Sequence, residues 1–370
     1  MYSTDDHRYM AEALRLAERG LYSTDPNPRV GCVLVRDGEI VGRGWHVRAG
    51  EGHAEVNALQ QAGALAAGAT AYVTLEPCCH QGRTPPCTEA LVNAGVAQVV
   101  AAMEDPNPRV AGQGLRRLRE AGIDATAGLL AAEAARLNPG FVMRMQHGRP
   151  WVRCKLAMSL DGRTAMANGE SRWITGEQAR RDVHRLRARS SAILTGIGTV
   201  QADDPMLTVR LAGEDASRAR QPLRVILDTR LRIRPDARLL DLPGKTLIIS
   251  GVKDLDKEDQ LALAGVSVAT LPLTTGRLDL EAVLRHLGSI EINEVHVEAG
   301  ADLSGALLQA GLIDELVVYM APHLMGDTAR GLFSLPALKL MEQRVELTIS
   351  DIRAVGRDWR ITATVKQDGT

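Results

Sequence analysis

Three side chains with the chemistry of zinc ligands lie in separate segments within the first quarter of the chain. His53 stands two residues before Glu55, Cys78 follows Pro77, and Cys87 comes nine residues after Cys78. An imidazole and two thiolates are a donor set that suits Zn²⁺. The chain must therefore fold so that the segments around residues 53, 78 and 87 meet at one point.

The number of ligands indicates a catalytic rather than a structural metal. Three protein ligands leave a fourth position open for water, and zinc lowers the pKa of such a water to about 7. Glu55, at a helix start, can face the same site without binding the metal and can carry a proton from the water to a substrate. His-x-Glu followed by Pro-Cys and a further Cys is typical of zinc deaminases that act on cytosine- or adenine-like rings. Here eight residues, instead of the usual two, separate the cysteines.

Other interpretations of the five cysteines remain open from these residues alone. The zinc could be purely structural, or the cysteines could be buried residues unrelated to a metal. Cys79 is a neighbour that could compete as a ligand, whereas Cys32 and Cys154 are most simply strand residues. His80 is either a substrate contact or a loop residue. An odd number of cysteines argues against a set of disulfides and for metal binding or catalysis.

Charge and hydropathy exclude several classes of partner. The 44 basic and 45 acidic residues nearly cancel and aromatic residues make up 3% of the chain, which argues against a nucleic-acid-binding surface. No apolar run approaches the ~20 residues of a membrane-spanning helix. The N-terminal MYSTDDHRYM has acidic residues where a secretory signal has basic ones. We expect a cytoplasmic protein that binds neither nucleic acid nor membrane.

The pattern of apolar residues predicts an α/β fold with two domains. In the first half it indicates helices at about 6–19, 53–63, 88–94, 115–121 and 131–137, a hairpin of 30–35 and 40–46, and strands at 71–75 and 96–102. This alternation is typical of a three-layer α/β domain. The polar segment 146–150 contains Gly148 and Pro150 and marks a boundary. We place the two domains at 1–147 and 150–370.

The second half predicts another α/β domain. Strands are indicated at 151–158, 191–195, 223–227, 246–250, 266–270, 292–298 and 315–321, helices near 176–188, 278–287 and 301–310, and a hairpin within 345–365. A Gly-x-Gly at 196–198 follows a strand, but Gln201 stands where the dinucleotide fingerprint requires Gly. The turn at 298–300 before a helix is a better phosphate cradle, although many strand-to-helix turns share its pattern.

One hexapeptide, DPNPRV, occurs at both 25–30 and 105–110. Two copies 80 residues apart are not the period of a solenoid. They are either two similar proline-rich turns or two loops that present Asn side chains to one pocket. The sequence by itself slightly favours the turns.

Several longer motifs follow in a fixed order along the chain. The first half contains Gly42-x-Gly44-x-His46 ahead of the HAE at 53–55, the loop PCCHQGRTPPC at 77–87, and EDPN at 104–107. The second half contains KLAMSLDGR at 155–163, DDPMLTVR at 203–210 and VEAG at 297–300. Together they resemble the bifunctional riboflavin-biosynthesis deaminase–reductases over essentially the whole chain. The one departure is Cys79, where that family usually has Ser.

The resemblance implies a cytidine-deaminase-like three-layer α/β fold for the first domain and a dihydrofolate-reductase-like α/β fold for the second. The first domain would hold one Zn²⁺ per chain through His53, Cys78 and Cys87, with Glu55 as its catalytic residue. It would deaminate the ring 2-amino group of a small phosphorylated pyrimidine, 2,5-diamino-6-ribosylamino-4(3H)-pyrimidinone 5′-phosphate. The second would use NADPH to reduce the ribosyl group of the product to ribityl, by hydride delivery to C1′.

The resemblance also carries over individual site residues. The deaminase substrate would meet Asn27, His46, His80, Arg83, Asp105 and Asn107, which favours the pocket interpretation of the repeated hexapeptide. NADPH would meet Ala157, Trp173, Thr199, Asp203, Thr229, Gly300, Ala301, Asp302, Leu303, Ser304, Gly305 and Ala306. The reductase substrate would meet Ser171, Arg187, Leu207, Arg210 and Glu298, with Arg187 and Arg210 suited to its phosphate. Lys155 and Asp203 are the candidates for catalytic proton handling.

Alternatives remain for single residues and for the function as a whole. Lys155 could be a solvated strand lysine, Trp173 a core aromatic and Ser171 a helix cap. A nucleic-acid-editing zinc deaminase with an accessory domain is a different function, which the charge and aromatic content disfavour. A zinc-stabilised binding module without catalysis is disfavoured by the open coordination position and Glu55. A homo-oligomer, either a dimer or a tetramer, is an expectation from the family.

Overall fold

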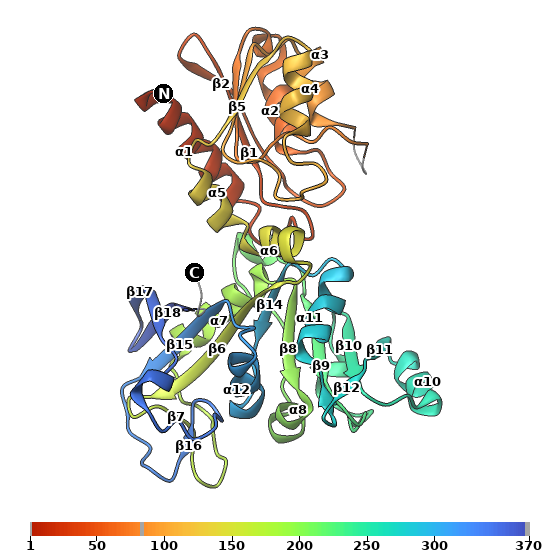
Figure 1. Cartoon of the computed structure of the whole chain (residues 1–370), viewed down its shortest axis with the longest axis vertical. Coiled ribbons are helices and arrows are strands. Elements are labelled where there is room, and N and C mark those ends of the chain that lie inside the picture. The colour runs from red at the N-terminus through yellow and green to blue at the C-terminus, as the bar shows by residue number, and fades with distance from the viewer. Residues whose placement is uncertain (1, 82–84, 367–370) are drawn as a thin grey trace. The chain divides into compact units, whose positions relative to one another are not determined.

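The chain divides into two compact units, residues 1–148 and 149–370, in the computed structural model. The structure describes residues 2–81 and 85–366, and Figure 1 labels the elements of both units. Among these described residues, none of the helices combines the length and the apolar character that a membrane crossing needs.

The first unit is a three-layer α/β/α domain. Its sheet has the order β2 (Glu39–Trp45), β1 (Gly31–Arg36), β3 (Thr70–Val73), β4 (Gln98–Ala101), β5 (Asp124–Ala127). Strand β1 is antiparallel to β2 and β3, whereas β3, β4 and β5 are parallel. One face packs against α1 (Thr4–Glu18) and α5 (Ala131–Leu137). The other packs against α2 (Ala54–Ala62), α3 (Cys87–Asn93) and α4 (Gln113–Glu120), as Figure 1 shows.

Local sequence explains how α1 and α2 are placed. Ser3 and Asp6 form a reciprocal capping box that starts α1, and an apolar stripe that includes Met10 and Ala13 is buried on the sheet. Helix α2 lies directly on the backbone of β2. A Cβ on Gly44 would lie 2.1 Å from the Ala54 carbonyl oxygen, so only glycine permits this approach. The N-terminus of α2 is thereby seated at the end of β2.

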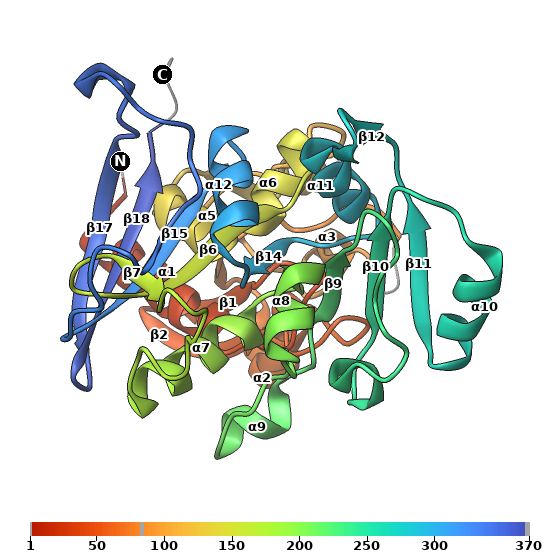
Figure 2. The ribbon, with the colours of Figure 1, turned by 90° about the horizontal axis from the view of Figure 1, so that it is seen from below.

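The second unit is built on a nine-stranded sheet. The order is β11 (Val266–Thr270), β10 (Thr246–Ser250), β9 (Leu223–Leu227), β8 (Ala192–Gly196), β14 (Glu294–Val297), β6 (Trp151–Ser159), β15 (Glu315–Ala321), β18 (Asp358–Val365), β17 (Leu347–Val355). The strands from β11 to β15 are parallel, and β18 and β17 continue the sheet antiparallel. In Figure 2, α11 (Leu280–Ser289) and α12 (Ala301–Gln309) lie on one side of this sheet. The helices α7 (Glu177–Arg189), α8 (Ile197–Asp203) and α10 (Leu255–Leu263) pack on the other side.

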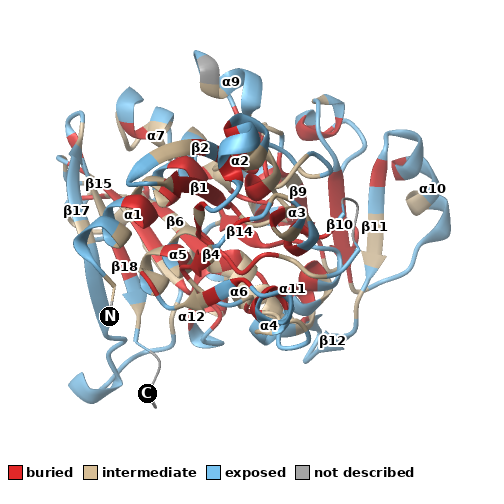
Figure 3. Cartoon of the chain, turned by 90° about the horizontal axis from the view of Figure 1, so that it is seen from above, coloured by how far each residue is buried: buried red, intermediate tan, exposed pale blue. Residues whose placement is uncertain are grey.

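Short elements complete the two units. They are the helices α6 (Pro139–His147) and α9 (Glu214–Arg218), the 3-10 turns η1 (Gly63–Ala66), η2 (Arg238–Asp241) and η3 (Met341–Gln343), and the strand pairs β7 (Arg163–Ala165) with β16 (Arg330–Gly331) and β12 (Leu273–Thr274) with β13 (Arg277–Leu278). Figure 3 shows buried residues concentrated in the central strands of each unit.

The two faces of the central strands β6 and β14 differ in chemistry. Residues of one face, such as Val152 and Val297, join the apolar core under α11 and α12. The α7 face instead carries charged side chains, because successive strand residues point to opposite faces. There Arg153 is buried and pairs with Glu294, Nη1 to Oε2 3.1 Å, and with Glu315. Further along β14 the buried His296 Nε2 lies 3.4 Å from Glu298 Oε1, so charged groups continue on this face to the carboxyl end of the strand.

The predicted α/β architecture is confirmed, and the strands expected in the second half all form within one or two residues of the expected bounds. The structure adds β5, α6, α8 and α10, which the apolar pattern did not indicate. The boundary also differs in detail. Gln146 and His147, taken as part of a polar linker, are the last residues of α6, and the helix ends at Gly148 with a positive φ of 69°.

Candidate functional site

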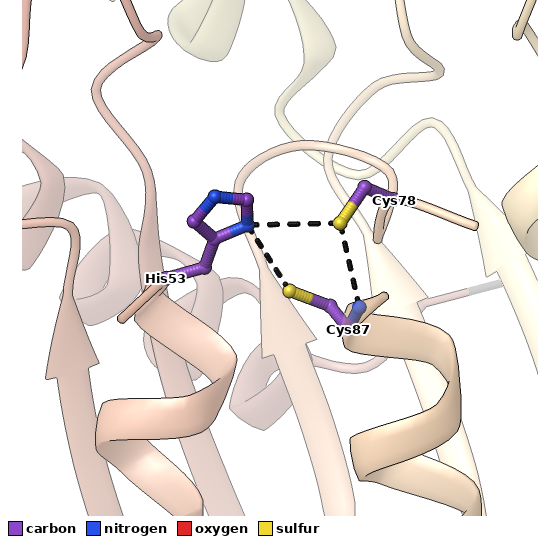
Figure 4. A group of neighbouring side chains, drawn as sticks. All are labelled: His53, Cys78 and Cys87. Carbon is purple, nitrogen blue, oxygen red and sulfur yellow. Dashed lines mark hydrogen bonds between the residues drawn. The ribbon is translucent and has the colours of Figure 1, made fainter. Parts of the chain in front are cut away.

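The three predicted metal ligands meet at one point of the first unit. His53 precedes α2 as its N-cap, Cys78 lies in the loop after β3, and Cys87 is the first residue of α3. As Figure 4 shows, the three side chains point toward one another. His53 Nδ1 lies 3.2 Å from Cys87 Sγ and 3.6 Å from Cys78 Sγ, and all three ligand atoms fall within 4.8 Å.

This geometry fits a tetrahedral zinc site. Zinc–sulfur bonds of about 2.3 Å and zinc–nitrogen bonds of about 2.0–2.1 Å place tetrahedral N and S ligands about 3.6 Å apart. The two measured N–S distances, 3.2 and 3.6 Å, are close to this value. Cys79 is not part of the group of metal-binding side chains found among the described residues. The three side chains can therefore hold Zn²⁺ with only small adjustments.

The surroundings of the cluster shift the pKa values of Cys78 and Glu55 in ways that suit a metal-binding thiolate and a proton carrier. Hydrogen bonds from Cys87 and His53 lower the pKa of Cys78 to about 4, so this sulfur is ionised near neutral pH. Glu55 lies in the first turn of α2 and is buried. Burial, with the neighbouring Cys78, raises the pKa of Glu55 to about 7. A carboxyl group with such a pKa can both accept and release a proton near neutral pH.

The first copy of the repeated hexapeptide lies beside the cluster. Asn27 Nδ2 is 3.1 Å from His46 Nε2, and His46 Nδ1 is 3.2 Å from the Gly52 carbonyl oxygen. The His46 ring is buried and meets the His53 ring edge-on, with their centroids 5.2 Å apart. Asn27 and His46 therefore border the metal-binding group.

The second copy approaches the cluster from the Cys78 side. Cys78, His80 and Asp105 line one small cavity together with residues of the same two loops. Burial raises the pKa of Asp105, and His80 opposes that change. The Asn107 side-chain oxygen accepts a hydrogen bond from the Arg109 backbone N–H, 3.1 Å. Both copies thus lie at the same site, whereas Arg83, predicted in the same loop as His80, lies outside the described residues.

Glu76, the residue directly before the PCCHQGRTPPC loop, organises this second loop. Its buried carboxylate accepts four backbone N–H hydrogen bonds, from Asp105, Gly112, Gly114 and Leu115 at 2.9, 2.9, 2.7 and 3.2 Å. A Cβ on Gly114 would lie 2.0 Å from the Pro77 carbonyl oxygen. The Glu-Pro-Cys sequence therefore fastens the loop of Asp105 to the metal ligand Cys78.

In the second unit, the predicted residues gather at the carboxyl edge of the parallel strands. Lys155 and Ala157 lie on β6, Thr199 follows β8, Thr229 follows β9, and Glu298 and Gly300 follow β14. The Glu298 backbone N–H donates to the Leu194 carbonyl, 3.0 Å, which extends the pairing of β14 with β8. In open α/β sheets this edge is where ligands bind, near the strand at which the order reverses.

Glu298 and Arg187 form a bidentate ion pair at this edge. Arg187 on α7 donates from Nε to Oε1 at 2.5 Å and from Nη2 to Oε2 at 2.9 Å, and its Nη1 donates to the Thr208 carbonyl at 2.9 Å. Burial alone would raise the pKa of Glu298, but the Arg187 guanidinium holds it well below its usual range. Burial lowers the pKa of Lys155, and Glu298 opposes that change.

The segment 300–306 forms a cradle for an anionic cofactor group. Gly300 is the N-cap of α12 and is exposed, and a Cβ there would meet no atom within 4 Å. The following residues Ala301 to Ala306 form the first turns of this helix, whose backbone N–H groups and dipole favour a phosphate. Ser304 is fully buried, and its hydroxyl interacts with the Cys154 thiol of β6. These features fit the diphosphate of NADPH.

The remaining predicted residues lie in the segments between strands. Trp173 is 68% exposed, so it is not a core aromatic, and the Arg180 guanidinium carbon lies 4.7 Å from its ring centroid. Ser171 comes shortly before it in the same segment. Asp203 is the last residue of α8. Leu207 is buried with a φ of 48°, a conformation that is uncommon for residues other than glycine and clusters at functional sites.

Comparison with known families divides the chain in the same way. Residues 3–103 match the family described as cytidine and deoxycytidylate deaminase zinc-binding region. Residues 150–361 match the family described as RibD C-terminal domain. The two matches cover the zinc-ligand segments and the strands of the nine-stranded sheet respectively.

Whole-chain relatives agree with both matches. The riboflavin biosynthesis protein RibD of Escherichia coli is 54% identical over 361 residues, covering 95% of this chain and 97% of that protein. The structure of Acinetobacter baumannii RibD has a TM-score of 0.92 at 47% identity, covering 98% of this chain and 99% of that one. A Thermotoga maritima diaminohydroxyphosphoribosylaminopyrimidine deaminase/5-amino-6-(5-phosphoribosylamino)uracil reductase has a TM-score of 0.86 at 31% identity, with coverage of 98% and 99%. The resemblance drawn from the motifs is confirmed.

Proposed function

The chain belongs to the RibD family of bifunctional riboflavin-biosynthesis deaminase–reductases, and we propose that its two reactions take place at the two sites built above. Deamination is assigned to residues 1–147 and reduction to residues 150–370. The observation that carries the assignment is the meeting of His53, Cys78 and Cys87 within 4.8 Å beside the buried Glu55. A nucleic-acid-editing deaminase is not favoured, because relatives match both halves of the chain.

In the deaminase, the proposed substrate is 2,5-diamino-6-ribosylamino-4(3H)-pyrimidinone 5′-phosphate, which loses its ring 2-amino group as ammonia. Zinc, when bound by His53, Cys78 and Cys87, supplies a Lewis acid that makes water nucleophilic near neutral pH. Glu55 takes a proton from the attacking water and gives it to the departing amino group. The raised pKa of Glu55, about 7, suits both transfers.

The substrate ring and ribose phosphate are proposed to lie among Asn27, His46, His80, Asp105 and Asn107, with Arg83 from the segment outside the described residues. The hydrogen bond between Asn27 and His46 and the shared cavity of His80 and Asp105 support this placement. Amide, imidazole and carboxylate groups together offer both donors and acceptors to a diaminopyrimidine. The hexapeptide repeat then serves one pocket from two loops.

In the reductase, the ribosyl C1′ of the deaminated product is reduced, and NADPH supplies the hydride when bound. Lys155 lies beside Glu298 at the carboxyl edge, and its lowered pKa suits proton donation to the opening ribose ring. Asp203, at the end of α8, is the second candidate for proton handling. The cofactor is proposed to lie along 300–306 with contacts from Ala157, Trp173, Thr199, Asp203 and Thr229. Ser171, Arg187, Leu207, Arg210 and Glu298 surround the substrate.

The test is a coupled assay that follows ammonia release and NADPH oxidation in the same sample. Glu55→Gln should abolish ammonia release and spare NADPH oxidation when the deaminated product is supplied. Lys155→Met should do the opposite. Loss of both activities in either folded variant would contradict the assignment of the reactions to separate sites. One zinc per chain in the purified protein, measured by metal analysis, completes the test.

A homo-oligomer is proposed, formed through β17 at the edge of the nine-stranded sheet. Within the described part of the chain, β17 pairs in that sheet with β18 alone, and Figure 3 shows it exposed along its length. Its Leu347, Ile349 and Ile352 side chains are exposed, although a free, apolar edge strand is normally protected. Ile352→Lys should convert a dimer or tetramer to smaller species in light scattering, whereas Leu263→Lys on exposed α10 should not. An unchanged mass for Ile352→Lys would refute this interface.

A cytoplasmic location is proposed as well. The structure records all five cysteines as free thiols, and zinc binding requires Cys78 and Cys87 to stay reduced. The reducing cytosol maintains thiols in that state. Fractionation of cells that express the tagged chain would test this.

A further inference from the structure

The two copies of the hexapeptide DPNPRV differ in how their arginine is placed. Arg29, in the first copy, is 6% exposed, and its Nη1 donates a hydrogen bond to the Leu137 carbonyl at 2.8 Å. Arg109, at the same position of the second copy, is exposed. Identical local sequences therefore have different surroundings, and the difference comes from a segment outside the hexapeptide.

Asn138 is the residue of that segment that holds the backbone of the first copy. It lies between α5 and α6 (Figure 1), beyond residue 103, where the match to the zinc-binding family ends. Its Oδ1 accepts from the Arg29 backbone N–H at 2.8 Å, and its Nδ2 donates to the Arg29 carbonyl at 2.9 Å. Asn138 is itself buried. These hydrogen bonds are costly to lose, because a buried backbone group left without a partner is destabilising.

The corresponding backbone N–H has a different acceptor in the second copy. There Asn107 Oδ1 accepts from the Arg109 backbone N–H at 3.1 Å, so this amide folds back onto its own loop. In the first copy, Asn138 already occupies the N–H of Arg29. This leaves the amide of Asn27, the counterpart of Asn107, to turn toward the pocket.

Asn27 turns toward His46 beside the metal-binding group. Its Nδ2 lies 3.1 Å from His46 Nε2, and the Val30 carbonyl accepts from the His46 backbone N–H at 2.9 Å. The His46 ring is buried and meets the His53 ring edge-on. The fixed backbone at 29–30 thus holds the Asn27 amide at the border of the site.

We propose that Asn138 is a positioning residue of the deaminase: by occupying the Arg29 backbone N–H, it keeps the Asn27 amide directed at the substrate. Without the Asn138 oxygen, Asn27 Oδ1 would become the acceptor for that N–H, as Asn107 Oδ1 is in the second copy. The Asn27 amide would then withdraw from His46 and from the pyrimidine. The proposal rests on the proposed function, since it takes Asn27 as a contact of the diaminopyrimidine. The residues that shape the deaminase pocket therefore extend to the connection between α5 and α6.

The test measures ammonia release by the full chain with the diaminopyrimidine substrate, for Asn138→Ala, Asn27→Ala and the double variant. Asn138→Ala should raise KM about 3- to 10-fold, the range for one lost hydrogen bond to a substrate, and keep kcat within about 2-fold of wild type. Asn27→Ala should raise KM by a similar factor. In the double variant KM should not rise further, because a residue that acts through Asn27 then has nothing to position. Zinc content, and NADPH oxidation with supplied deaminated product, should match the wild type.

Two further variants separate positioning from a purely structural role. Asn138→Asp keeps an oxygen for the Arg29 N–H and loses only the bond to the carbonyl. Its KM should therefore stay closer to the wild-type value than that of Asn27→Ala, and this comparison holds even if Asn138→Ala does not fold. Asn93→Ala, at the exposed end of α3, is the control and should leave both kinetic constants unchanged.

Three outcomes decide between the alternatives. Multiplied KM effects in the double variant would overturn the proposal, because contributions that are independent of each other multiply. A KM for Asn138→Asp as high as that for Asn27→Ala would overturn it as well. If the wild-type chain released no ammonia from the diaminopyrimidine, the proposed function itself would fail instead.

Discussion

The Glu76 carboxylate is the feature whose removal should most clearly separate the two activities. Its two oxygens hold the start of α4 and the loop of Asp105: Oε2 accepts from the backbones of Asp105 and Gly112, and Oε1 from those of Gly114 and Leu115. In Glu76→Gln one oxygen becomes an NH₂ group. Whichever way the amide is oriented, two of the four backbone donors then face a donor instead of an acceptor.

The expected cost follows from this count. Each hydrogen bond to a charged group contributes about 1.5–3 kcal/mol, so two lost bonds destabilise the loop by about 3–6 kcal/mol. A domain of this size is stable by only about 5–15 kcal/mol. The first unit should therefore unfold at a temperature lower by about 10 °C or more. Because Asp105 and Cys78 are fastened through this carboxylate, ammonia release should fall at least about 100-fold.

The assay measures three quantities on the same variant: ammonia release, NADPH oxidation with the deaminated product, and the unfolding temperature of each unit by calorimetry. NADPH oxidation should stay at the wild-type rate, since the reductase residues belong to the other unit. Glu120→Gln on α4 is the control, because Glu120 is 61% exposed and only 4.0 Å from Arg116 in a surface pair. Wild-type ammonia release and an unchanged unfolding temperature for Glu76→Gln would refute the reasoning.

Three further predictions address the packing, the metal and the acid stability. Gly44→Ala places a Cβ 2.1 Å from the Ala54 carbonyl, so it should displace α2, destabilise the first unit by about 1–3 kcal/mol and lower its zinc content; full zinc occupancy and unchanged urea unfolding would contradict this. Removing zinc with a chelator should stop ammonia release, spare NADPH oxidation with supplied product, and be reversed by added Zn²⁺; a parallel loss of both activities would count against separate sites. The Ser159 hydroxyl and two backbone N–H groups lower the pKa of Asp161 to about 2, below the usual value near 3.9. This carboxylate therefore stabilises the second unit above pH 4 and loses that effect as the pH falls toward 2. Asp161→Asn should flatten this part of the acid unfolding profile, and an unaltered profile would disprove the contribution.

Much of the fold could be predicted because its elements carry local signals. The parallel strands of the second unit are short, apolar and bounded by turns. The alternation of apolar and polar residues and the short continuous apolar runs therefore located them. Elements without such a signal were missed. Helix α8 contains Gly198, Thr199 and Val200, which are poor helix formers, and α10 buries only Leu261. These helices form because the neighbouring strands and turns fix their ends. The positions of those strands and turns are not encoded in the helical segment itself.

The first site was more predictable than the second. The zinc ligands have few chemical alternatives, and Glu55 is two residues from His53 in one turn of α2. Glu76 directly precedes the cysteine loop, yet its role depends on a loop some 30 residues later, which the sequence cannot position. In the second unit, the motifs indicated which residues belong to the site but not which residues each of them contacts. The ion pair between Arg187 and Glu298, for example, joins two residues that the motifs placed in separate segments.

The sequence by itself determined the chemistry available to this protein: a His and two Cys for zinc, a carboxyl group for proton transfer, and two α/β domains with nearly balanced charge. These follow from residue type, short spacing and periodicity, which are properties of local segments. The tertiary structure alone decided which groups share a site and which charged groups pair. Glu298 and Arg187 are 111 residues apart, and His184 on α7 contacts Arg210, which lies 26 residues later. Such contacts depend on strand order and on which face a side chain occupies, and neither is written in any one segment.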